Sequence, residues 1–261
     1  MQFSFGMDEV KKWAKFSCDY NPIHFNLEDA KRAGLDALIL HGMLALLPVK
    51  QAVSKEYLQQ NDFDAGWMKF RALFRNPIPH DCMVRLWTKT VDGGLNFRIS
   101  EPESEREHFR GAYIPVGDPT PQFANDVAKI KFSTIPDGKN QCRFAEYYPN
   151  VQERWIELDA VIFSEFIRSE IQVFKEMSQM HGKNASKNVL FQTSHSVTFD
   201  TGFFADESLA SLDFEQVTYG ITEPEMISSD DQLIGTVSLL VMAGHRLVML
   251  LEIGLIAKKL L

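Results

Sequence analysis

The sequence predicts an α+β fold built from two similar halves. Helical segments precede a run of short strands in residues 1–117, which is the element order of an α+β unit. A long amphipathic segment followed by strands recurs later in the chain, and a stretch rich in Pro and Gly separates the two. We therefore expect a first unit over residues 1–117, a connection over 118–140 and a second unit over 141–261.

Three helical segments are expected near the N-terminus. Apolar residues recur at helical spacing after residue 8, and this helix is expected to end at the Asn21-Pro22 break. A second short helix is expected over residues 27–34. A longer helix is expected from residues 41–42 towards residue 59, with a bend or a late start at Pro48, because proline removes a backbone hydrogen bond.

Strands are expected where β-branched and aromatic residues cluster between turn signals. The Pro-rich stretch 76–81 and the Asp-Gly-Gly stretch 92–94 are the clearest turns of the first half. The expected strands of the first half are 67–74, 83–90, 95–100 and 109–116.

The second half is expected to repeat this plan without an alignable sequence repeat. Apolar residues at helical intervals predict a long helix over residues 153–180. The expected strands are 143–148, 189–200, 214–222, 231–242 and 245–258.

Composition narrows the classes of partner. The 261 residues are 45% hydrophobic and carry a net charge of −8, so a large core is expected, and the absence of a long Lys/Arg run argues against nucleic-acid binding. The N-terminal residues lack the pattern of a secretory signal, and the apolar stretch 233–257 is interrupted by polar residues, so neither export nor a membrane span is expected. A cytoplasmic location follows as an expectation.

The chain has three widely separated cysteines. Cys18, Cys82 and Cys142 lack the paired spacing of zinc-binding motifs, so reduced thiols are expected, with no disulfide framework and no zinc site.

Asp19, Asn21 and His24 surround a proline that cannot continue a helix. A carboxylate and an imidazole can share proton transfer to and from water, and an amide can fix their geometry. A capped surface turn is the alternative interpretation, since Asp and Asn commonly cap turns.

His41-Gly42 favours the catalytic interpretation. The pair stands at the expected start of the long helix, where backbone N–H groups are free and the positive end of the helix dipole lies. Gly42 would let a ligand approach this backbone closely, so a thioester carbonyl could be held there and an enolate oxygen stabilised.

This register resembles that of the MaoC-like (R)-specific enoyl-CoA hydratases, also called hydratase 2. The family pattern is Ser-Gly-Asp-x-Asn-Pro-(Leu/Ile)-His-x-Asp, then Ala-x-x-Ala-Gly, then Pro-Ile-x-His-Gly-Met. The matching segments are Ser17-Cys18-Asp19-Tyr20-Asn21-Pro22-Ile23-His24-Phe25-Asn26, Ala30-Lys31-Arg32-Ala33-Gly34 and Leu38-Ile39-Leu40-His41-Gly42-Met43, without insertion or deletion.

The resemblance implies a hot-dog fold, in which an antiparallel sheet wraps a long helix, with the site where two such folds meet. A double hot dog is therefore expected. Carried over by position, Asp19 and His24 would be the acid/base pair, Asn21 their orienter and Gly42 the oxyanion donor. The same register would place Ser17, His41 and Met43 against the substrate, with Ser17 as a supporting hydrogen-bond partner and His41 in a mainly structural role.

Three positions depart from the family pattern. Asn26 replaces an aspartate and Leu38 replaces a proline, and neither removes a proposed catalytic side chain. Cys18 replaces a glycine, so the backbone is expected to be strained there if the position requires positive φ. A partly buried, inert thiol is expected at Cys18 in preference to a reactive one.

The second half carries no matching motif. His181, His195 and His245 are expected to be core or solvated histidines, and residues 141–261 a degenerate, non-catalytic hot dog that completes the pocket of the first. The long helix of this second half would line the acyl side of the pocket.

The function expected is hydration or dehydration of an acyl thioester of coenzyme A (CoA) or acyl carrier protein (ACP), a lyase reaction of fatty acid metabolism. The reaction requires no metal or redox cofactor. Two alternatives stay open: a hot-dog acyl-CoA thioesterase, and a non-catalytic acyl-thioester binding protein. A single chain and a homodimer of double hot dogs are both open as the functional unit.

Overall fold

The computed structural model describes residues 1–61, 66–135, 139–169, 188–205, 216–228 and 232–259. Its helices in the first half match the expected segments closely. The expected helix 8–21 ends earlier, at Ser17, and Pro48 lies within a helix that continues past it. The helices of residues 1–117 are α1 (Met7–Ser17), the 3₁₀ turn η1 (Pro22–His24), α2 (Leu27–Arg32) and α3 (Gly42–Gln60).

Strands follow the helices in the first half, as predicted. The bounds of β2 agree with the prediction, and those of β3, β4 and β5 differ by one or two residues. The strands are β1 (Gln2–Phe3), β2 (Trp67–Phe74), β3 (Val84–Val91), β4 (Gly94–Ser100) and β5 (Glu107–Val116).

The rest of the chain holds a second helix-then-strand series. Some expected features lie outside the described residues: the end of the helix 153–180, residues 214–215 and 231 of two expected strands, and His181. The described elements are α4 (Thr120–Val127), β6 (Ser133–Thr134), α5 (Lys139–Tyr147), α6 (Arg154–Ser169), β7 (Asn188–Asp200), α8 (Thr201–Ala205), β8 (Val217–Ile221), β9 (Glu225–Ser228), β10 (Gln232–Ala243) and β11 (Arg246–Lys259).

The expected strand over residues 143–148 is wrong, because residues 143–147 belong to α5. Asn140 and Phe144 are its buried residues, and their spacing of four is helical, whereas the aromatic content alone favours a strand. The Phe144 ring packs against Phe16 of α1 at a centroid distance of 5.3 Å. The expected connection over residues 118–140 is also more structured than predicted, since it contains α4 and β6 and the start of α5.

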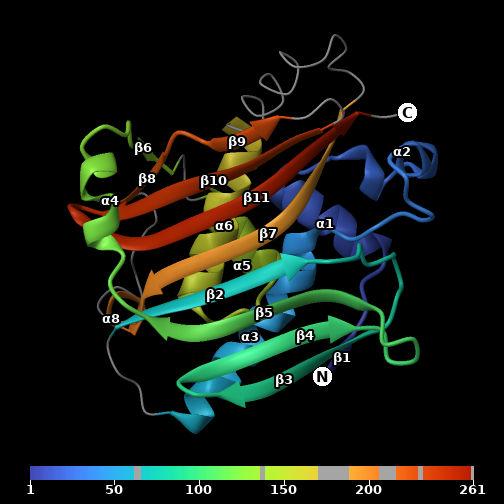
Figure 1. Ribbon diagram of the computed structural model, residues 1–261, viewed down its shortest axis with the longest axis horizontal. Coiled ribbons are helices and arrows are strands. Elements are labelled where there is room, and N and C mark those ends of the chain that lie inside the picture. Colours follow the sequence, from blue (N-terminus) through green and yellow to red (C-terminus); the bar gives the residue numbers. More distant parts are fainter. Residues whose placement is uncertain (62–65, 136–138, 170–187, 206–215, 229–231, 260–261) are drawn as a thin grey trace.

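All of the described strands form one antiparallel sheet. Along it the order is β1-β3-β4-β5-β2-β7-β11-β10-β8-β6, and β9 pairs with β10. The two halves join where β2 lies beside β7, with register from Trp67 opposite Asp200 to Leu73 opposite Ser194. Helices α1, α3, α5 and α6 cover one face of the sheet (Figure 1). The fold is therefore an antiparallel sheet backed by helices from both halves.

One hydrophobic core spans the two halves. Trp155 of α6 stacks on Phe199 of β7 at 4.5 Å between ring centroids, and it also lies 6.2 Å from Phe70 of β2. Aromatic pairs of this kind contribute about 0.5–1.5 kcal/mol beyond their burial. The halves thus share one packed interior.

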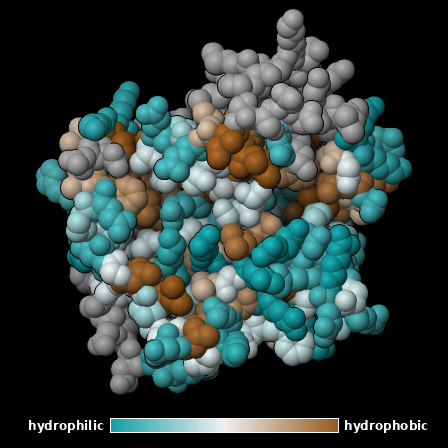
Figure 2. Space-filling model, viewed as in Figure 1, coloured by the Kyte–Doolittle hydropathy of each residue, from teal (hydrophilic) through white to brown (hydrophobic). Residues whose placement is uncertain are grey.

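The outer surface carries both hydrophilic and apolar areas. Apolar side chains gather over β9 (Figure 2), where Ile227 is 74% exposed.

Among the described residues, none of the helices has both the length and the apolar character needed to cross a membrane.

Candidate functional site

The expected catalytic motif begins where α1 ends. Ser17 is the last residue of α1, and its hydroxyl donates to the carbonyl of Trp13 at 2.9 Å and accepts from the N–H of Asp19 at 3.2 Å. Cys18 caps the helix with φ 60° and ψ 18°, in the left-handed region, and its side chain is exposed, so the expected partial burial is wrong. The expected strain at the glycine position is confirmed, since a side chain in this region costs about 1–2 kcal/mol. This reversal directs Asp19 away from the axis of α1.

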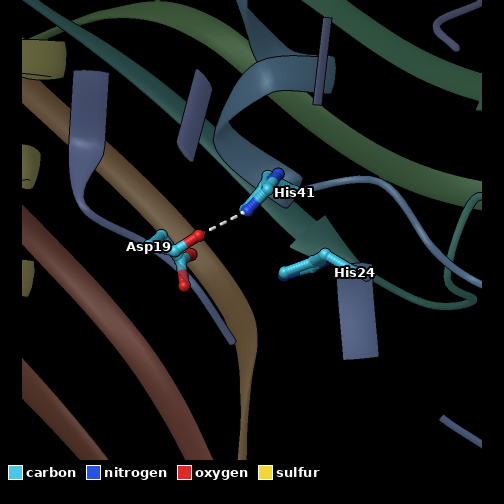
Figure 3. Close-up of side chains that lie close together, drawn as sticks. All are labelled: Asp19, His24 and His41. Atoms are coloured by element: carbon cyan, nitrogen blue, oxygen red, sulfur yellow. Dashed lines mark hydrogen bonds between the residues drawn. The ribbon is translucent and has the colours of Figure 1, made fainter. Parts of the chain in front are cut away.

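His41 holds the backbone of Asp19. The Nε2–H of His41 donates to the Asp19 carbonyl at 2.9 Å (Figure 3). The His41 ring is 1% exposed, and burial together with the neighbouring His24 lowers its pKa to about 3. His41 is therefore neutral at physiological pH and acts on Asp19 as a hydrogen-bond donor.

His24 is a buried base with a defined tautomer. Its Nδ1 lies 2.8 Å from the carbonyl oxygen of Ile39, and because a carbonyl can only accept, Nδ1 carries the proton. Burial lowers the pKa of His24, although the nearby Asp19 carboxylate opposes this. The neutral ring therefore leaves a lone pair on Nε2. The His24 and His41 rings lie 3.7 Å apart between centroids, and one ligand atom from each lies within 4.8 Å of one from Asp19.

The start of α3 lies at the same place. His41 is the N-cap of α3 and its side chain makes no capping hydrogen bond, so the first N–H groups of the helix have no side-chain acceptor there. A methyl group at Gly42 would lie 2.7 Å from Cε2 of Phe74 and 3.2 Å from Oε1 of Gln192. Glycine therefore keeps this helix start open to a ligand.

The side chain of Asn21 contacts the second half. The Asn21 backbone N–H donates to Oδ1 of Asp19 at 3.3 Å, while its Nδ2 donates to the carbonyl of Leu190 in β7 at 2.7 Å. Asn21 was expected to orient the acid/base pair through its amide. In the structure its backbone contacts the carboxylate, and its side chain fixes the turn against β7.

A cavity of about 610 Å³ unites these groups. Asp19, Asn21, His24 and Gly42 all line it. Apolar side chains from both halves form much of the remaining wall: Leu35, Ile39, Leu40, Phe74, Ile78, Phe109, Phe163, Ile167, Leu190, Phe191, Leu255 and Ile256. Phe163 and Ile167 of α6 line the cavity, and the expected contact of this helix with an acyl chain stays a prediction.

The three expected substrate contacts do not line the cavity. Ser17 and Met43 are fully buried and neither lines it, and His41 also lies behind the wall. Ser17 acts on Asp19 through the hydrogen bond described above, and Met43 belongs to the hydrophobic core. Their contact with substrate stays a prediction.

Gln192 is a polar cavity residue that the sequence did not reveal. A bulge places it there: Leu255 pairs with Gln192 and Gly254 with Ser194, which leaves Thr193 as the extra residue. Gly254 permits this bulge, because a Cβ there would lie 2.8 Å from Oγ1 of Thr193. Nε2 of Gln192 lies 3.3 Å from Nδ1 of His195, so its carbonyl oxygen is directed towards Gly42.

A buried network stands behind Gln192. His195 Nε2 lies 2.8 Å from Oδ1 of Asp159, whose other oxygen pairs with Lys50 of α3, and all three side chains are 0% exposed. Burial alone would raise the pKa of Asp159, but Lys50 and His195 lower it overall. The carboxylate thus stays charged. This network connects α3, α6 and β7 beside the cavity.

A sequence signal for this network existed. Lys50 directly follows an apolar run in α3, and Asp159 lies between apolar residues of α6; such charged residues are almost never fully buried unless paired. The other histidines agree with expectation, since His195 is a core residue and His245 is exposed.

Comparison with known proteins finds similarity in the first half of the chain. The family model described as "MaoC like domain" matches residues 4–108. A curated relative, the mitochondrial 3-hydroxyacyl-[acyl-carrier-protein] dehydratase of Arabidopsis thaliana, is 34% identical over 53 residues. That alignment covers 20% of this chain and 32% of the relative, so the match spans about a third of its length.

Two solved structures also align with the chain. A structure named MaoC-like dehydratase is 9% identical, with 100% of this chain and 96% of the other covered at a TM-score of 0.49. The (R)-hydratase from A. caviae involved in PHA biosynthesis is 20% identical, with 45% of this chain and 92% of the other covered at a TM-score of 0.34. Both scores are below 0.5, so neither structure adds to the family assignment. The expected resemblance to the MaoC-like family is confirmed over residues 4–108, which the model of this domain matches.

Proposed function

We propose that this chain is an acyl-thioester hydratase or dehydratase that adds or removes water across the 2,3 double bond of an enoyl thioester. One arrangement supports the proposal most. A neutral His24 with a free Nε2 lone pair and the Asp19 carboxylate share a cavity with the uncapped start of α3 at Gly42. This combines a proton-transfer pair with a donor for a developing oxyanion.

In the hydration direction, the thioester carbonyl accepts a hydrogen bond from the Gly42 N–H. Water is held between Asp19 and His24 and loses one proton as its oxygen bonds to C3 of the substrate. Charge moves to the carbonyl oxygen as an enolate, which the start of α3 stabilises through its N–H groups and dipole. One proton is then delivered to C2, so the pair ends in its starting state.

The second half closes the pocket in this proposal. Each half supplies a long helix, α3 or α6, and a set of antiparallel strands, and the two sets meet at β2 and β7. We infer that they are two hot dogs, a catalytic one over residues 1–117 and a degenerate one over 141–261. Phe163, Ile167 and Leu255 offer apolar surface for the acyl chain.

Product analysis tests this function. Purified protein is incubated with trans-2-enoyl-CoA esters of increasing chain length, starting from crotonyl-CoA, and with the matching enoyl-ACP. Loss of the conjugated enoyl absorbance, chirality of the 3-hydroxyacyl product and release of free thiol are followed together. We expect the (R)-3-hydroxyacyl thioester without thiol release.

Two other outcomes would contradict the proposal. Release of free CoA without hydration would indicate a thioesterase, and tight binding without turnover at any chain length would indicate a non-catalytic acyl-thioester binding protein. The His245→Gln variant serves as a control, because His245 is exposed and outside the cavity.

A further inference from the structure

Three potential metal ligands meet at one end of the strands β3, β4 and β5. Cys82 lies two residues before β3, Glu101 directly follows β4, and His108 is the second residue of β5. Neighbouring antiparallel strands bring these sequence-distant positions together. The Sγ, carboxylate and imidazole atoms lie within 4.8 Å of one another.

The hydrogen bonding of His108 fixes which ring nitrogen carries a proton. Nδ1 lies 3.2 Å from the carbonyl oxygen of Asn76, which can only accept, so Nδ1 is the donor. In the neutral ring Nε2 then presents a lone pair. The His108 side chain is 0% exposed, and its Nε2 has no hydrogen-bond partner among the residues that the structure describes.

That lone pair faces a carboxylate. Nε2 of His108 lies 3.3 Å from Oε1 of Glu101, and two acceptors at this separation repel each other unless a cation lies between them. The cation is either a proton on Nε2 or a metal ion. A proton would satisfy His108 and Glu101 alone, with the Cys82 S–H donating to the carbonyl of Met83 at 3.7 Å, whereas a metal ion would engage all three side chains.

We propose that Cys82, Glu101 and His108 bind a zinc ion. Imidazole, carboxylate and thiolate are the ligand types that Zn²⁺ takes, and three protein ligands leave the fourth tetrahedral position to water. Binding replaces the S–H proton of Cys82, which is released to solvent, by a Zn–S bond. The Nδ1–H bond to a backbone carbonyl is the outer contact that orients a metal-bound histidine.

The site stabilises the wall of the cavity. The His108 carbonyl accepts from the N–H groups of Arg75 at 2.7 Å and Asn76 at 3.2 Å, and both residues line the cavity. Zinc is thus assigned a structural role that does not depend on the proposed reaction. The spacing of the cysteines did not predict this site, because only one of its three ligands is a cysteine. The three ligands also come from three different segments of the chain.

Metal binding is measured on the full chain. Protein treated with a chelator and desalted is titrated with ZnCl₂, bound zinc is quantified by elemental mass spectrometry, and thermal unfolding is followed with and without the metal. Co²⁺ is used as a second probe, because a thiolate ligand gives a charge-transfer band. We expect one equivalent of zinc, a higher midpoint of unfolding with zinc, and a cobalt–thiolate band.

Matched variants assign the site. Cys82→Ser should remove the cobalt–thiolate band and weaken zinc binding by more than about a hundredfold, since even outer contacts are worth 10–100-fold. Glu101→Gln should also weaken zinc binding while keeping the sulfur. Cys142→Ser, at an exposed cysteine in α5, should bind zinc like the wild type.

Two results would overturn the zinc site. One is a wild type that takes up no stoichiometric zinc and unfolds at the same temperature with and without it, in which case His108 and Glu101 form an imidazolium–carboxylate pair. The other is a cobalt–thiolate band that persists in Cys82→Ser or disappears in Cys142→Ser. If Cys82→Ser does not fold, Glu101→Gln decides between the same outcomes by its zinc affinity.

Discussion

Asn21 and Leu190 are 169 residues apart in the chain and share a 2.7 Å hydrogen bond from the Asn21 side chain to the Leu190 carbonyl. The same Asn21 donates its backbone N–H to the carboxylate of Asp19 at 3.3 Å. One residue therefore contacts the proposed acid/base group and also holds the motif against β7 of the second half. The position of the carboxylate depends on both halves of the chain.

Removal of the hydrogen bond from the Asn21 side chain to the Leu190 carbonyl should impair activity more than stability. Asn21→Ala is expected to lower kcat/KM for enoyl-CoA hydration about tenfold and the free energy of unfolding by about 1 kcal/mol, the usual net value of a hydrogen bond. Asn61→Ala is the control, because Asn61 makes a 3.0 Å bond of the same type to the Tyr57 carbonyl far from the cavity. Equal losses of activity in the two variants would contradict this role of Asn21.

A methyl group at Gly42 should block the oxyanion position. Gly42→Ala would press against Phe74 and Gln192, and we expect kcat to fall about a hundredfold, within the range for loss of an oxyanion contact. Steady-state kinetics with circular dichroism would check this. Gly117→Ala is the control, since no atom lies within 4 Å of a Cβ there, and comparable activity in both variants would exclude the oxyanion role.

The buried histidines should make the protein less stable in acid. The pKa of His41 is about 3 in the folded protein, against about 6.5 when unfolded, so the unfolded state binds more protons between these values. The contribution of neutral His41 to the free energy of unfolding is complete above about pH 6.5 and is lost as the pH falls towards 3. Between pH 6.5 and pH 5 the free energy of unfolding should drop by up to about 2 kcal/mol for this residue.

Urea unfolding of His41→Gln checks this pH dependence. The variant should lose less stability than the wild type between pH 6.5 and pH 5, because the titrating ring is absent. His245→Gln, at an exposed histidine outside the cavity, is the control variant. A wild-type stability that is constant over this range would show that His41 does not stay neutral when folded.

Removal of one partner of the buried Lys50–Asp159 pair should lower the free energy of unfolding more than replacement of both partners by apolar residues. Asp159→Asn leaves Lys50 uncompensated, and we expect the free energy of unfolding to fall by about 3–5 kcal/mol. The double variant Lys50→Met with Asp159→Leu removes both charges and should lose less than Asp159→Asn alone. Denaturant titration of both variants tests the ordering, and the reverse ordering would contradict a paired charge at these positions.

Local sequence patterns predicted the first half of the molecule well. The motif from Asp19 to Gly42 could be predicted because its residues are close in sequence and its breaks are made by proline and glycine. The strand β2 was predicted with the observed bounds, since its apolar alternation is regular. The positive φ of Cys18 followed from the glycine that the family has there.

Features that depend on distant contacts could not be predicted in this way. Gln192 reaches the cavity through a bulge whose register is set by pairing with β11, and no local pattern encodes that register. The strand expected at residues 143–148 is helical because Phe144 packs against Phe16, 128 residues earlier. Cys82, Glu101 and His108 likewise converge only once β3, β4 and β5 have paired.

The central claim is that Asp19 performs proton transfer on an enoyl thioester, and the most direct test is the Asp19→Asn variant. Hydration of 2-enoyl-CoA and the dissociation constant of the same ester are measured for variant and wild type. We predict a loss of kcat of more than about a hundredfold with the dissociation constant changed by less than about threefold. A variant that hydrates the ester at the wild-type rate would contradict the assignment.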